Sequence, residues 1–279
     1  MDAKPLPLLP GAASAEVLRV RAGRALEQRD RLCEEVAVAL EFNGISHAVM
    51  LATPADLEDF ALGFALTEGI VEHPDEVFDI AAQESAQGIT LRVDIASRRL
   101  QALKLRRRSL AGRTGCGLCG TDSLEQALRP VAPVGAGPDV APAALARAVA
   151  ALRPLQPLFE ATGSVHAAAL CSVQGEPLLV REDVGRHNAL DKLIGGAARG
   201  GLDARDALLV ISSRASIEMV QKAATLGCAV LAAVSAPTAL AVRAATGAGM
   251  TLVGRIRGDD MVVYCGAQRL RMPAGAPGS

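Results

Sequence analysis

Two cysteines spaced Cys-x-x-Cys, Cys116 and Cys119, are the residues of this sequence best suited to covalent chemistry. Glycines precede, separate and follow them, and glycine leaves the sulfur atoms open to close approach by another molecule. A basic run at 104–108 lies upstream, and the segment 122–125 is typical of a helix start. Nearby cations and a helix N-terminus both favour thiolate over thiol. The sequence therefore predicts an accessible cysteine pair of low pKa.

Metal binding is a poor explanation of this pair. A structural zinc site needs a second pair or two suitably spaced histidines, and the histidines at 47, 73, 166 and 187 lack that spacing. A zinc deaminase needs His-x-Glu followed downstream by Pro-Cys-x-x-Cys. His166 is followed by Ala167 and Ala168, and the cysteines lie upstream of it. We therefore expect no metal site.

Dithiol redox exchange and sulfur transfer both remain open for the pair. A thioredoxin-type motif opens a long helix in a small fold, so the surrounding glycines and the 279-residue length argue against it without excluding it. Sulfur transfer needs a reachable thiolate on a mobile loop, a charged surface that docks a donor, and an acceptor site nearby. Candidates for all three are present.

Composition narrows the range of partners. Aromatic residues make up 2% of the chain and the net charge is −1, which argues against nucleic acid and anionic membrane as partners. Six cysteines are too few for a disulfide scaffold and indicate the cytoplasm. We expect four of them to be inert core residues, namely Cys33, Cys171, Cys228 and Cys265. The uncharged stretch between Lys222 and Arg243 is divided by turn residues and predicts α/β core rather than a membrane span.

The first half of the chain predicts an α+β domain at 16–135 that carries the cysteine loop and follows a disordered tail at 1–15. Asn43-Gly44 between two apolar runs is a strong hairpin signal. Thr53-Pro54 is typical of an N-cap and first helical turn, for a helix that ends near Gly69. The expected strands lie at 16–21, 35–41, 45–52, 76–80 and 90–94, and a short helix is expected before Pro130.

The second half, 136–279, predicts an α/β domain beyond a Pro- and Gly-rich linker at 130–142. Apolar runs alternate with amphipathic segments, which indicates a largely parallel sheet covered on both faces. The expected strands lie at 178–182, 206–211, 228–234, 251–256 and 261–265, and the expected helices at 142–152, 187–199, 215–226 and 237–246. The chain is α/β overall.

Polar residues follow three of these strands. They are Ser212, Ser213 and Arg214, then Ser235 and Thr238, and then the run from Arg255 to Asp260. Open α/β sheets bind ligands at such strand ends, where helix N-termini and an arginine suit phosphate. The alternative is that the serines and Thr238 only cap helices. Three polar strand ends together favour a ligand site.

A dense polar segment at 181–192 lies at another junction between a strand and a helix. His187 and Asp191 are one helical turn apart and could pair, which would orient the imidazole. The equally weighted alternative is a solvated network of ion pairs that caps the helix. His166, in the segment 162–166, is more simply a core residue than a ligand.

Taken together, these motifs resemble a known family, the formate dehydrogenase accessory sulfurtransferases, over about residues 33–270. The resemblance rests on Asn43-Gly44, Thr53-Pro54, Gly63-Phe64, Glu68-Gly69-Ile70, Cys116-Gly117-Leu118-Cys119-Gly120, Thr162 to Ala168, Glu182 to Lys192, Ser235 to Thr238 and Met261 to Tyr264. The run from Glu182 to Lys192 is long and specific.

This resemblance implies a cytoplasmic sulfur carrier. Such a protein takes sulfur from an L-cysteine desulfurase and passes it to the molybdenum cofactor, in its bis(molybdopterin guanine dinucleotide) form, before the cofactor enters formate dehydrogenase. The family's second domain is similar to the three-layer α/β fold of cytidine deaminases but has no zinc. A homodimer is compatible with the high alanine and valine content. The rival functions are a dithiol redox module and a chaperone that only delivers the cofactor.

The resemblance also assigns residues. It implies that Cys116 carries the persulfide with Cys119 assisting, and that the cofactor contacts one segment before the final strand. That segment comprises Arg255, Ile256, Arg257, Gly258, Asp259 and Asp260. Arg214 and Arg257 would bind the cofactor's phosphates, and Ser212, Ser235 and Thr238 would shape its pocket. The chain departs from the family where it has Ser213 and Ser164 in place of glycines, and where Arg255 replaces a common aromatic residue.

Overall fold

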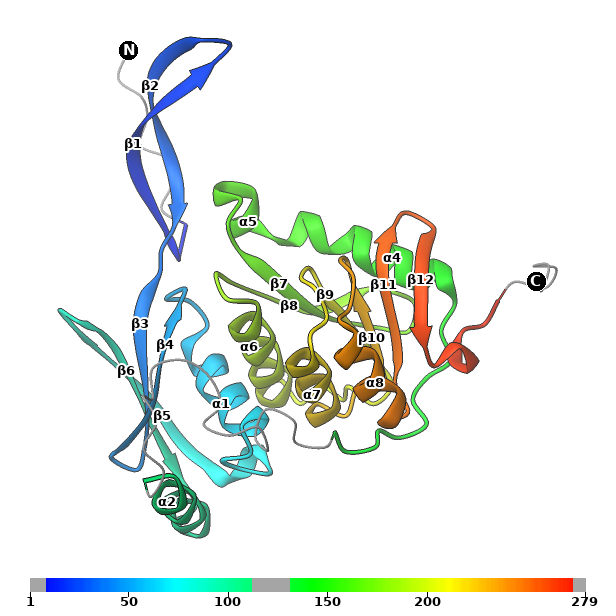
Figure 1. The fold of residues 1–279 in the computed structure, drawn as a ribbon. Helices are drawn as coiled ribbons and strands as arrows, with labels where there is room; N and C mark the ends of the chain where they lie inside the picture. Colours follow the sequence, from blue (N-terminus) through cyan, green and yellow to red (C-terminus); the bar gives the residue numbers. More distant parts are fainter. Residues whose placement is uncertain (1–8, 112–130, 273–279) are drawn as a thin grey trace.

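The structure is a computed structural model that describes residues 9–111 and 131–272, the side chains of 106–111 excepted. Its described part contains three β-sheets and a set of helices packed on two of them (Figure 1). The mixed α/β architecture predicted from the sequence is confirmed. The predictions for residues 1–8, 112–130 and 273–279 lie outside the described residues, and these include the short helix expected before Pro130.

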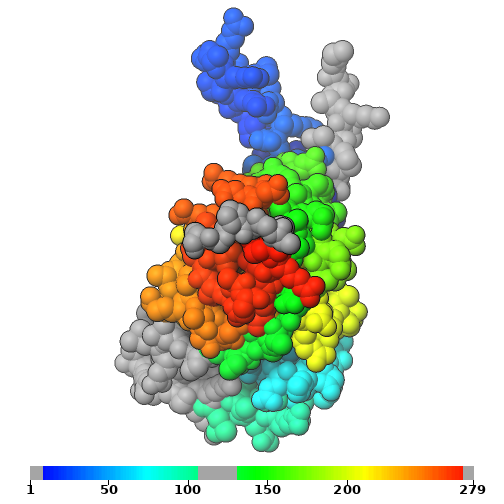
Figure 2. All heavy atoms as spheres, turned by 90° about the vertical axis from the view of Figure 1, so that its right-hand side faces the viewer, coloured from blue at the N-terminus to red at the C-terminus, as the bar shows by residue number. Residues whose placement is uncertain are grey.

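The first sheet is a two-stranded antiparallel arm, β1 (Ala12–Arg21) with β2 (Arg24–Cys33). Figures 1 and 2 both show the arm standing clear of the rest of the molecule. Residues 12–15, expected in a disordered tail, belong to β1, and β2 was not predicted. Both faces of β2 are largely exposed, so its sequence lacks the alternation of apolar and polar residues that indicates a strand.

The second sheet has four strands in the order β4-β3-β6-β5. Its elements are β3 (Val36–Phe42), β4 (Ile45–Ala52), β5 (Val77–Ser85) and β6 (Gly88–Ile95). The predicted Asn43-Gly44 hairpin is confirmed, with positive φ at both residues. The helix α1 (Leu57–Thr67) packs its phenylalanines against the buried face of this sheet. The 3-10 turn η1 (Pro74–Glu76) precedes β5, and α2 (Ser97–Ala111), a basic helix absent from the sequence prediction, follows β6.

The predicted helix start at Thr53-Pro54 is wrong. The helix α1 begins at Leu57, and its N-cap is Asp56 with a φ of 51°. Thr53 is fully buried, and its backbone N–H donates to Asp183 Oδ2 at 3.0 Å. Its hydroxyl accepts from the Val184 N–H at 3.1 Å. Thr53 is therefore engaged with the second half of the chain, which removes it from the cap position.

The third sheet has six strands in the order β12-β11-β10-β9-β7-β8. The strands are β7 (His166–Cys171), β8 (Pro177–Asp183), β9 (Leu208–Ile211), β10 (Val230–Ala233), β11 (Thr251–Arg257) and β12 (Asp260–Cys265). Only the β9–β10 and β10–β11 pairs are parallel, so the expectation of a largely parallel sheet is wrong. Short turns join β7 to β8 and β11 to β12 as hairpins, and a hairpin is necessarily antiparallel.

Helices cover both faces of this sheet (Figure 1). On one face lie α4 (Pro142–Leu152), the 3-10 turn η2 (Arg153–Leu155) and α5 (Pro157–Thr162). On the other lie α6 (Arg186–Arg199), α7 (Ile217–Thr225) and α8 (Ala239–Gly247), and a 3-10 turn η3 (Ala267–Arg269) follows β12. Each face has its own hydrophobic cluster, which gives three layers. No helix of the described residues is long and apolar enough to cross a membrane.

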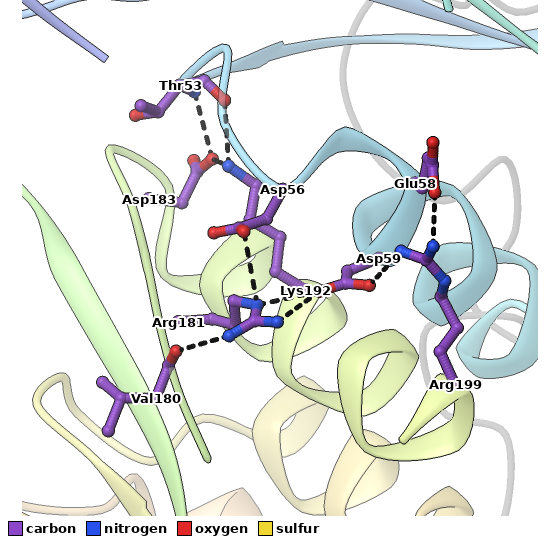
Figure 3. Close-up of polar contacts among 9 residues, drawn as sticks. All are labelled: Thr53, Asp56, Glu58, Asp59, Val180, Arg181, Asp183, Lys192 and Arg199. Atoms are coloured by element: carbon purple, nitrogen blue, oxygen red, sulfur yellow. Dashed lines mark hydrogen bonds and ion pairs between the residues drawn. The ribbon is translucent and has the colours of Figure 1, made fainter. Parts of the chain in front are cut away.

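The α1 and α6 helices join the two larger sheets. A Cβ added at Gly63 of α1 would overlap the Asp191 carbonyl of α6, and one added at Gly195 would overlap the Asp59 carbonyl of α1. The two helix backbones therefore touch at a crossing where each presents a glycine. Asp59 also accepts from Arg181 Nη2 at 2.7 Å and from Arg199 Nη1 at 2.8 Å (Figure 3). The sheets are thus held by backbone packing and by a buried carboxylate.

Candidate functional site

The polar strand ends predicted from the sequence meet at one edge of the six-stranded sheet. The parallel strands β9, β10 and β11 end there, and the antiparallel strand β7 begins there. The Ala167 N–H donates to Ser212 Oγ at 2.9 Å, and the Arg255 N–H donates to the Ser235 carbonyl at 3.2 Å. These bonds tie neighbouring strand ends together, so the residues form one continuous edge.

A pocket of about 640 Å³ lies at this edge, on the α4 and α5 side. Its walls are mainly apolar, with a few polar groups among them. Its lining residues are Val149, Leu152, Arg153, Gln156, Phe159, Gly163, Ser164, Val165, His166, Ser212 and Val234. Apolar walls with a few polar groups, at this volume, are typical of small-molecule sites.

Two features of the pocket suit a polar planar ligand. The Arg153 guanidinium lies 3.9 Å from the centre of the Phe159 ring, which fixes a flat cation at the wall. The Gln156 side chain is buried in the wall and hydrogen-bonds to the Glu182 carboxylate, which holds a polar group at a fixed place in the pocket. The sequence interpretation missed these three residues, because only the prolines around them stood out.

The hydroxyl-bearing residues at the strand ends differ in their hydrogen bonds. Thr238 caps α8, accepting from the Ala241 N–H at 3.2 Å, as the capping alternative expects. Ser212 Oγ instead accepts a hydrogen bond from a strand and caps no helix. Ser235 is half-buried, and its carbonyl receives the Arg255 N–H. Arg214 is exposed in the loop between β9 and α7.

The segment from Arg255 to Asp260 forms the end of β11 and the turn into β12. Arg255 has a φ of 54° and interrupts the β11–β12 register, and Gly258 has a φ of 58°. Arg255, Arg257, Asp259 and Asp260 are exposed, whereas the Ile256 side chain is 2% exposed and packs in the core. In this arrangement Ile256 offers a ligand only its backbone.

A cationic flank continues the edge toward α6 and α7. Burial lowers the pKa of His166, and the nearby Arg186 guanidinium lowers it further. Burial, Arg186 and Lys222 lower the pKa of His187 to about 4. Both imidazoles are therefore neutral at pH 7, which leaves Arg186 as the cation between them. Arg186 Nε and His187 Nε2 have no hydrogen-bond partner among the described residues.

The His187–Asp191 pair predicted as one alternative is wrong. His187 Nε2 lies 4.0 Å from Glu218, outside hydrogen-bonding distance. Asp191 points into the interior, where Lys222 Nζ lies 2.7 Å and 2.9 Å from its two oxygens. The Thr67 hydroxyl also donates to it, at 2.7 Å.

The other alternative for this segment, an ion-pair network, is right in kind but wrong in setting, because the network is buried rather than solvated (Figure 3). Asp183 lies 2.6 Å from Lys192 Nζ, and both side chains are fully buried. Lys192 also donates to the Thr53 carbonyl at 2.9 Å. Glu182 accepts from the first N–H groups of α5. Most of this motif therefore joins the two sheets, and Arg186 lies near His166 of the pocket wall.

Cys116 and Cys119 lie outside the described residues, as does Arg113, the arginine just before the cysteine pair. The described chain ends on that side with α2, whose first turn is held by Arg99 to Glu76 at 2.8 Å. Lys104 of α2 is exposed. The basic run thus begins on a helix anchored to the four-stranded sheet.

The other four cysteines are of two kinds. Cys171 and Cys228 are fully buried, and burial raises their pKa to about 12 and about 11. They are inert core residues, as predicted. Cys33 and Cys265 are only half-buried, which corrects that prediction for them. Burial raises the pKa of Cys33, so its thiol is protonated at neutral pH.

Comparison with known proteins identifies the family to which this chain belongs. The sequence profile of the FdhD/NarQ family matches residues 33–271. This chain belongs to the FdhD/NarQ family. The match spans both larger sheets and the whole strand-end edge.

Relatives within the FdhD/NarQ family are similar along nearly their whole length. The chain is 54% identical to the sulfur carrier protein FdhD of Variovorax paradoxus, covering 99% of this chain and 100% of that protein. It is 52% identical to that of Cupriavidus necator, covering 98% and 93%. The crystal structure assigned as a formate dehydrogenase accessory protein from Desulfotalea psychrophila matches with a TM-score of 0.76 at 23% identity, covering 94% of this chain and 100% of that one. This last likeness supports the fold.

Proposed function

We propose that this chain is a sulfur carrier for the maturation of formate dehydrogenase. It accepts sulfur from an L-cysteine desulfurase as a persulfide on Cys116 and transfers it to the molybdenum cofactor, in its bis(molybdopterin guanine dinucleotide) form, before insertion. The observation that carries the proposal is identity above 50% to proteins named sulfur carrier protein FdhD over almost the entire chain. The Cys-x-x-Cys pair supplies the chemistry that the name requires.

The sulfur transfer uses the two cysteines and, to complete the cycle, an external thiol reductant. The Cys116 thiolate attacks the terminal sulfur of the donor's persulfide, and the donor cysteine leaves as a thiolate. Attack by Cys119 on the Cys116 persulfide then forms a Cys116–Cys119 disulfide and releases hydrosulfide to the acceptor. The dithiol supplies two electrons in this step, so a thiol reductant must restore the pair. Cys119 is therefore a resolving residue.

The acceptor binds at the strand-end edge. Arg214, Arg255 and Arg257 are exposed there and would bind its phosphates. Ser212 and Ser235 shape the edge, and the Arg153–Phe159 pair lies where a flat ring would stack. The gathering of these groups at one edge of the sheet supports a single extended site. Thr238, Gly258, Asp259 and Asp260 form its rim, and Ile256 contributes through its backbone.

Membership of the same family also supports proposals about the domain division, the docking of the sulfur donor and the cellular compartment. The segments 16–135 and 136–279 are separate domains, and the second is similar to cytidine deaminases without their zinc. Its three layers support that likeness. The basic residues at 104–108, with Arg113, dock the donor or attract the anionic cofactor, and the exposed Lys104 on α2 supports either role. The protein acts in the cytoplasm, in keeping with its few cysteines.

Intact-mass measurement after incubation with a desulfurase and L-cysteine tests the proposal. We expect a gain of about 32 Da, roughly one sulfur atom, located on the peptide of Cys116. Cys116→Ala abolishes the gain, whereas Cys33→Ala, a matched control outside the pair, retains it. A reversible Cys116–Cys119 disulfide with no persulfide would favour a redox module. Full formate dehydrogenase activity in the double cysteine variant would favour a delivery chaperone.

A further inference from the structure

The short helix α5 forms one wall of the pocket at the strand-end edge. It spans six residues, Pro157–Thr162, and both Phe159 and the N-cap residue Gln156 line the pocket. A helix of this length is not stable in water by its own hydrogen bonds. The Gln156 side chain makes no capping hydrogen bond to the first turn. A group outside α5 must therefore hold this wall in place.

Glu182 of β8 provides that group. Its Oε2 accepts a hydrogen bond from the Leu158 N–H at 2.9 Å, and its Oε1 accepts one from the Phe159 N–H at 2.8 Å. Negative charge beside the first N–H groups of a helix is stabilising. The neighbours of Glu182 on the strand, Arg181 and Asp183, form their ion pairs with α1 and α6 instead. Glu182 is therefore the residue at this end of β8 that supports the pocket wall.

The same carboxylate fixes the orientation of the Gln156 amide. The Gln156 side chain hydrogen-bonds to Glu182, and the residue is only 4% exposed. An ionised carboxylate only accepts hydrogen bonds, whereas the amide has a donor, Nε2, and an acceptor, Oε1. Nε2 therefore faces Glu182, and Oε1 is the polar atom that the side chain offers to the pocket it lines. No residue in the described part of the chain donates to Oε1. The pocket thus presents a fixed acceptor at this point.

A fixed acceptor discriminates between flat rings that stack equally well. The Arg153–Phe159 wall stacks on a ring of any kind, because every base has a π face. Guanine offers two adjacent donors at one edge, a ring N–H and an amino group, and pterins carry the same pair. Adenine offers an amino donor beside a ring-nitrogen acceptor. A glutamine that turns freely pairs with adenine through both its amide oxygen and its amide nitrogen. Gln156 cannot do so, because Glu182 engages its nitrogen.

We propose that Gln156 makes this pocket select a ring with two adjacent donors, as in guanine and pterins, over adenine, and that Glu182 is the positioning residue that holds Gln156 for this selection. Glu182 acts through the Gln156 amide and the first turn of α5, and it is not among the residues that line the pocket. The inference rests on the proposed function, because it names the part of the cofactor that the pocket receives. The phosphates are left to the exposed arginines of the strand-end edge.

Calorimetric titration of the full chain with guanosine diphosphate and adenosine diphosphate tests the proposal through the ratio of two affinities. We expect the wild type to bind guanosine diphosphate at least roughly tenfold more tightly. Gln156→Leu should weaken guanosine diphosphate by roughly tenfold and adenosine diphosphate by less than about twofold, because only the first loses a hydrogen bond. In Glu182→Gln the new amide can face Gln156 with a donor or an acceptor, so Gln156 can turn over. The ratio should then shift at least about fivefold towards adenosine diphosphate.

Two matched variants and a second probe complete the test. Gln174→Leu and Glu176→Gln make the same changes at exposed positions between β7 and β8, and both should bind the two nucleotides like the wild type. Neopterin carries the pair of donors on a pterin. A larger effect of Gln156→Leu on neopterin than on guanosine diphosphate assigns the pocket to the pterin end of the cofactor, and the reverse assigns it to the guanine end.

The ratio of affinities separates selection from a general loss of structure, because a displaced α5 weakens both nucleotides equally. Equal weakening of both nucleotides in Glu182→Gln overturns the proposal. So does an unchanged ratio in Gln156→Leu, or a wild type that binds both nucleotides equally or binds neither. The gain of mass at Cys116 is measured on the wild type without nucleotide, so a failure of the proposed function is distinguished from a failure of this inference.

Discussion

The Asp183 carboxylate and the Thr53 backbone N–H are 3.0 Å apart, although the residues lie in different halves of the chain. Asp183 ends β8, and Thr53 follows β4, so this hydrogen bond joins the six-stranded sheet to the four-stranded sheet. The same carboxylate receives the Gly185 N–H at 2.7 Å and pairs with Lys192. The Thr53 N–H, the Gly185 N–H and the Lys192 ammonium therefore all meet one aspartate at this buried junction.

Replacing that aspartate should be costly. In Asp183→Asn, Lys192 remains fully buried without its counter-charge, and breaking a buried pair in this way costs about 3–5 kcal/mol. Urea unfolding should show the loss as a lower midpoint. Asp203→Asn removes an exposed pair with Arg205 and should cost less than about 1 kcal/mol. Equal losses in the two variants would mean that the junction contributes nothing beyond a surface ion pair.

A single methyl group added at the crossing of α1 and α6 should lower the stability of the fold. In Gly63→Ala the new Cβ meets the Asp191 backbone, which cannot rotate away, so the two helices must separate. We expect a loss of about 1–3 kcal/mol, in the range of overpacked cores, measured by thermal unfolding. Gly247→Ala, at the end of α8, adds a methyl group in open space and should be neutral or slightly stabilising. A neutral Gly63→Ala would show that the crossing tolerates expansion.

His187 should make stability depend on pH in the mildly acidic range. Burial and Arg186 lower its folded pKa to about 4, so between that value and its unfolded pKa near 6.5 the unfolded chain binds more protons. Stability is therefore lost as the pH falls from about 6.5 to about 4, by on the order of 1–2 kcal/mol after allowance for partial exposure. His187→Gln should flatten this part of the profile. Unfolding midpoints measured every half pH unit provide the test, and an unchanged slope in the variant would exclude His187 as the cause.

Arg153 should matter for ligand binding. If the ring of a nucleotide stacks at the Arg153–Phe159 wall, Arg153→Ala should weaken binding of guanosine diphosphate, used as a probe, by roughly tenfold. Calorimetric titration measures this directly. Arg147→Ala changes a nearby arginine of α4 that does not line the pocket and should bind like the wild type. Equal affinities in the two variants would place the probe elsewhere on the strand-end edge.

Local signals in the sequence predicted most elements of the second half. Pro142 at the start of α4 and the apolar run of β11 lie within a residue or so of their predicted places, because both depend on short-range preferences. The Asn43-Gly44 turn is equally local, since each of its residues adopts the positive φ that the turn requires. The gathering of Ser212 and Ser235 at one edge followed from the order of parallel strands.

The sequence alone determined the cysteine pair, the turns and the polar strand ends, because their chemistry and geometry depend only on a few neighbouring residues. Only the tertiary structure decided what Thr53, Asp183 and His187 do. Thr53 has the sequence of a helix cap, but burial against Asp183 gave it a stronger set of hydrogen bonds across the molecule. His187 lies one turn from Asp191, yet Lys222 from a distant helix neutralises that carboxylate. A buried charge takes the partner that desolvation makes most favourable, and sequence distance does not record which partner that is.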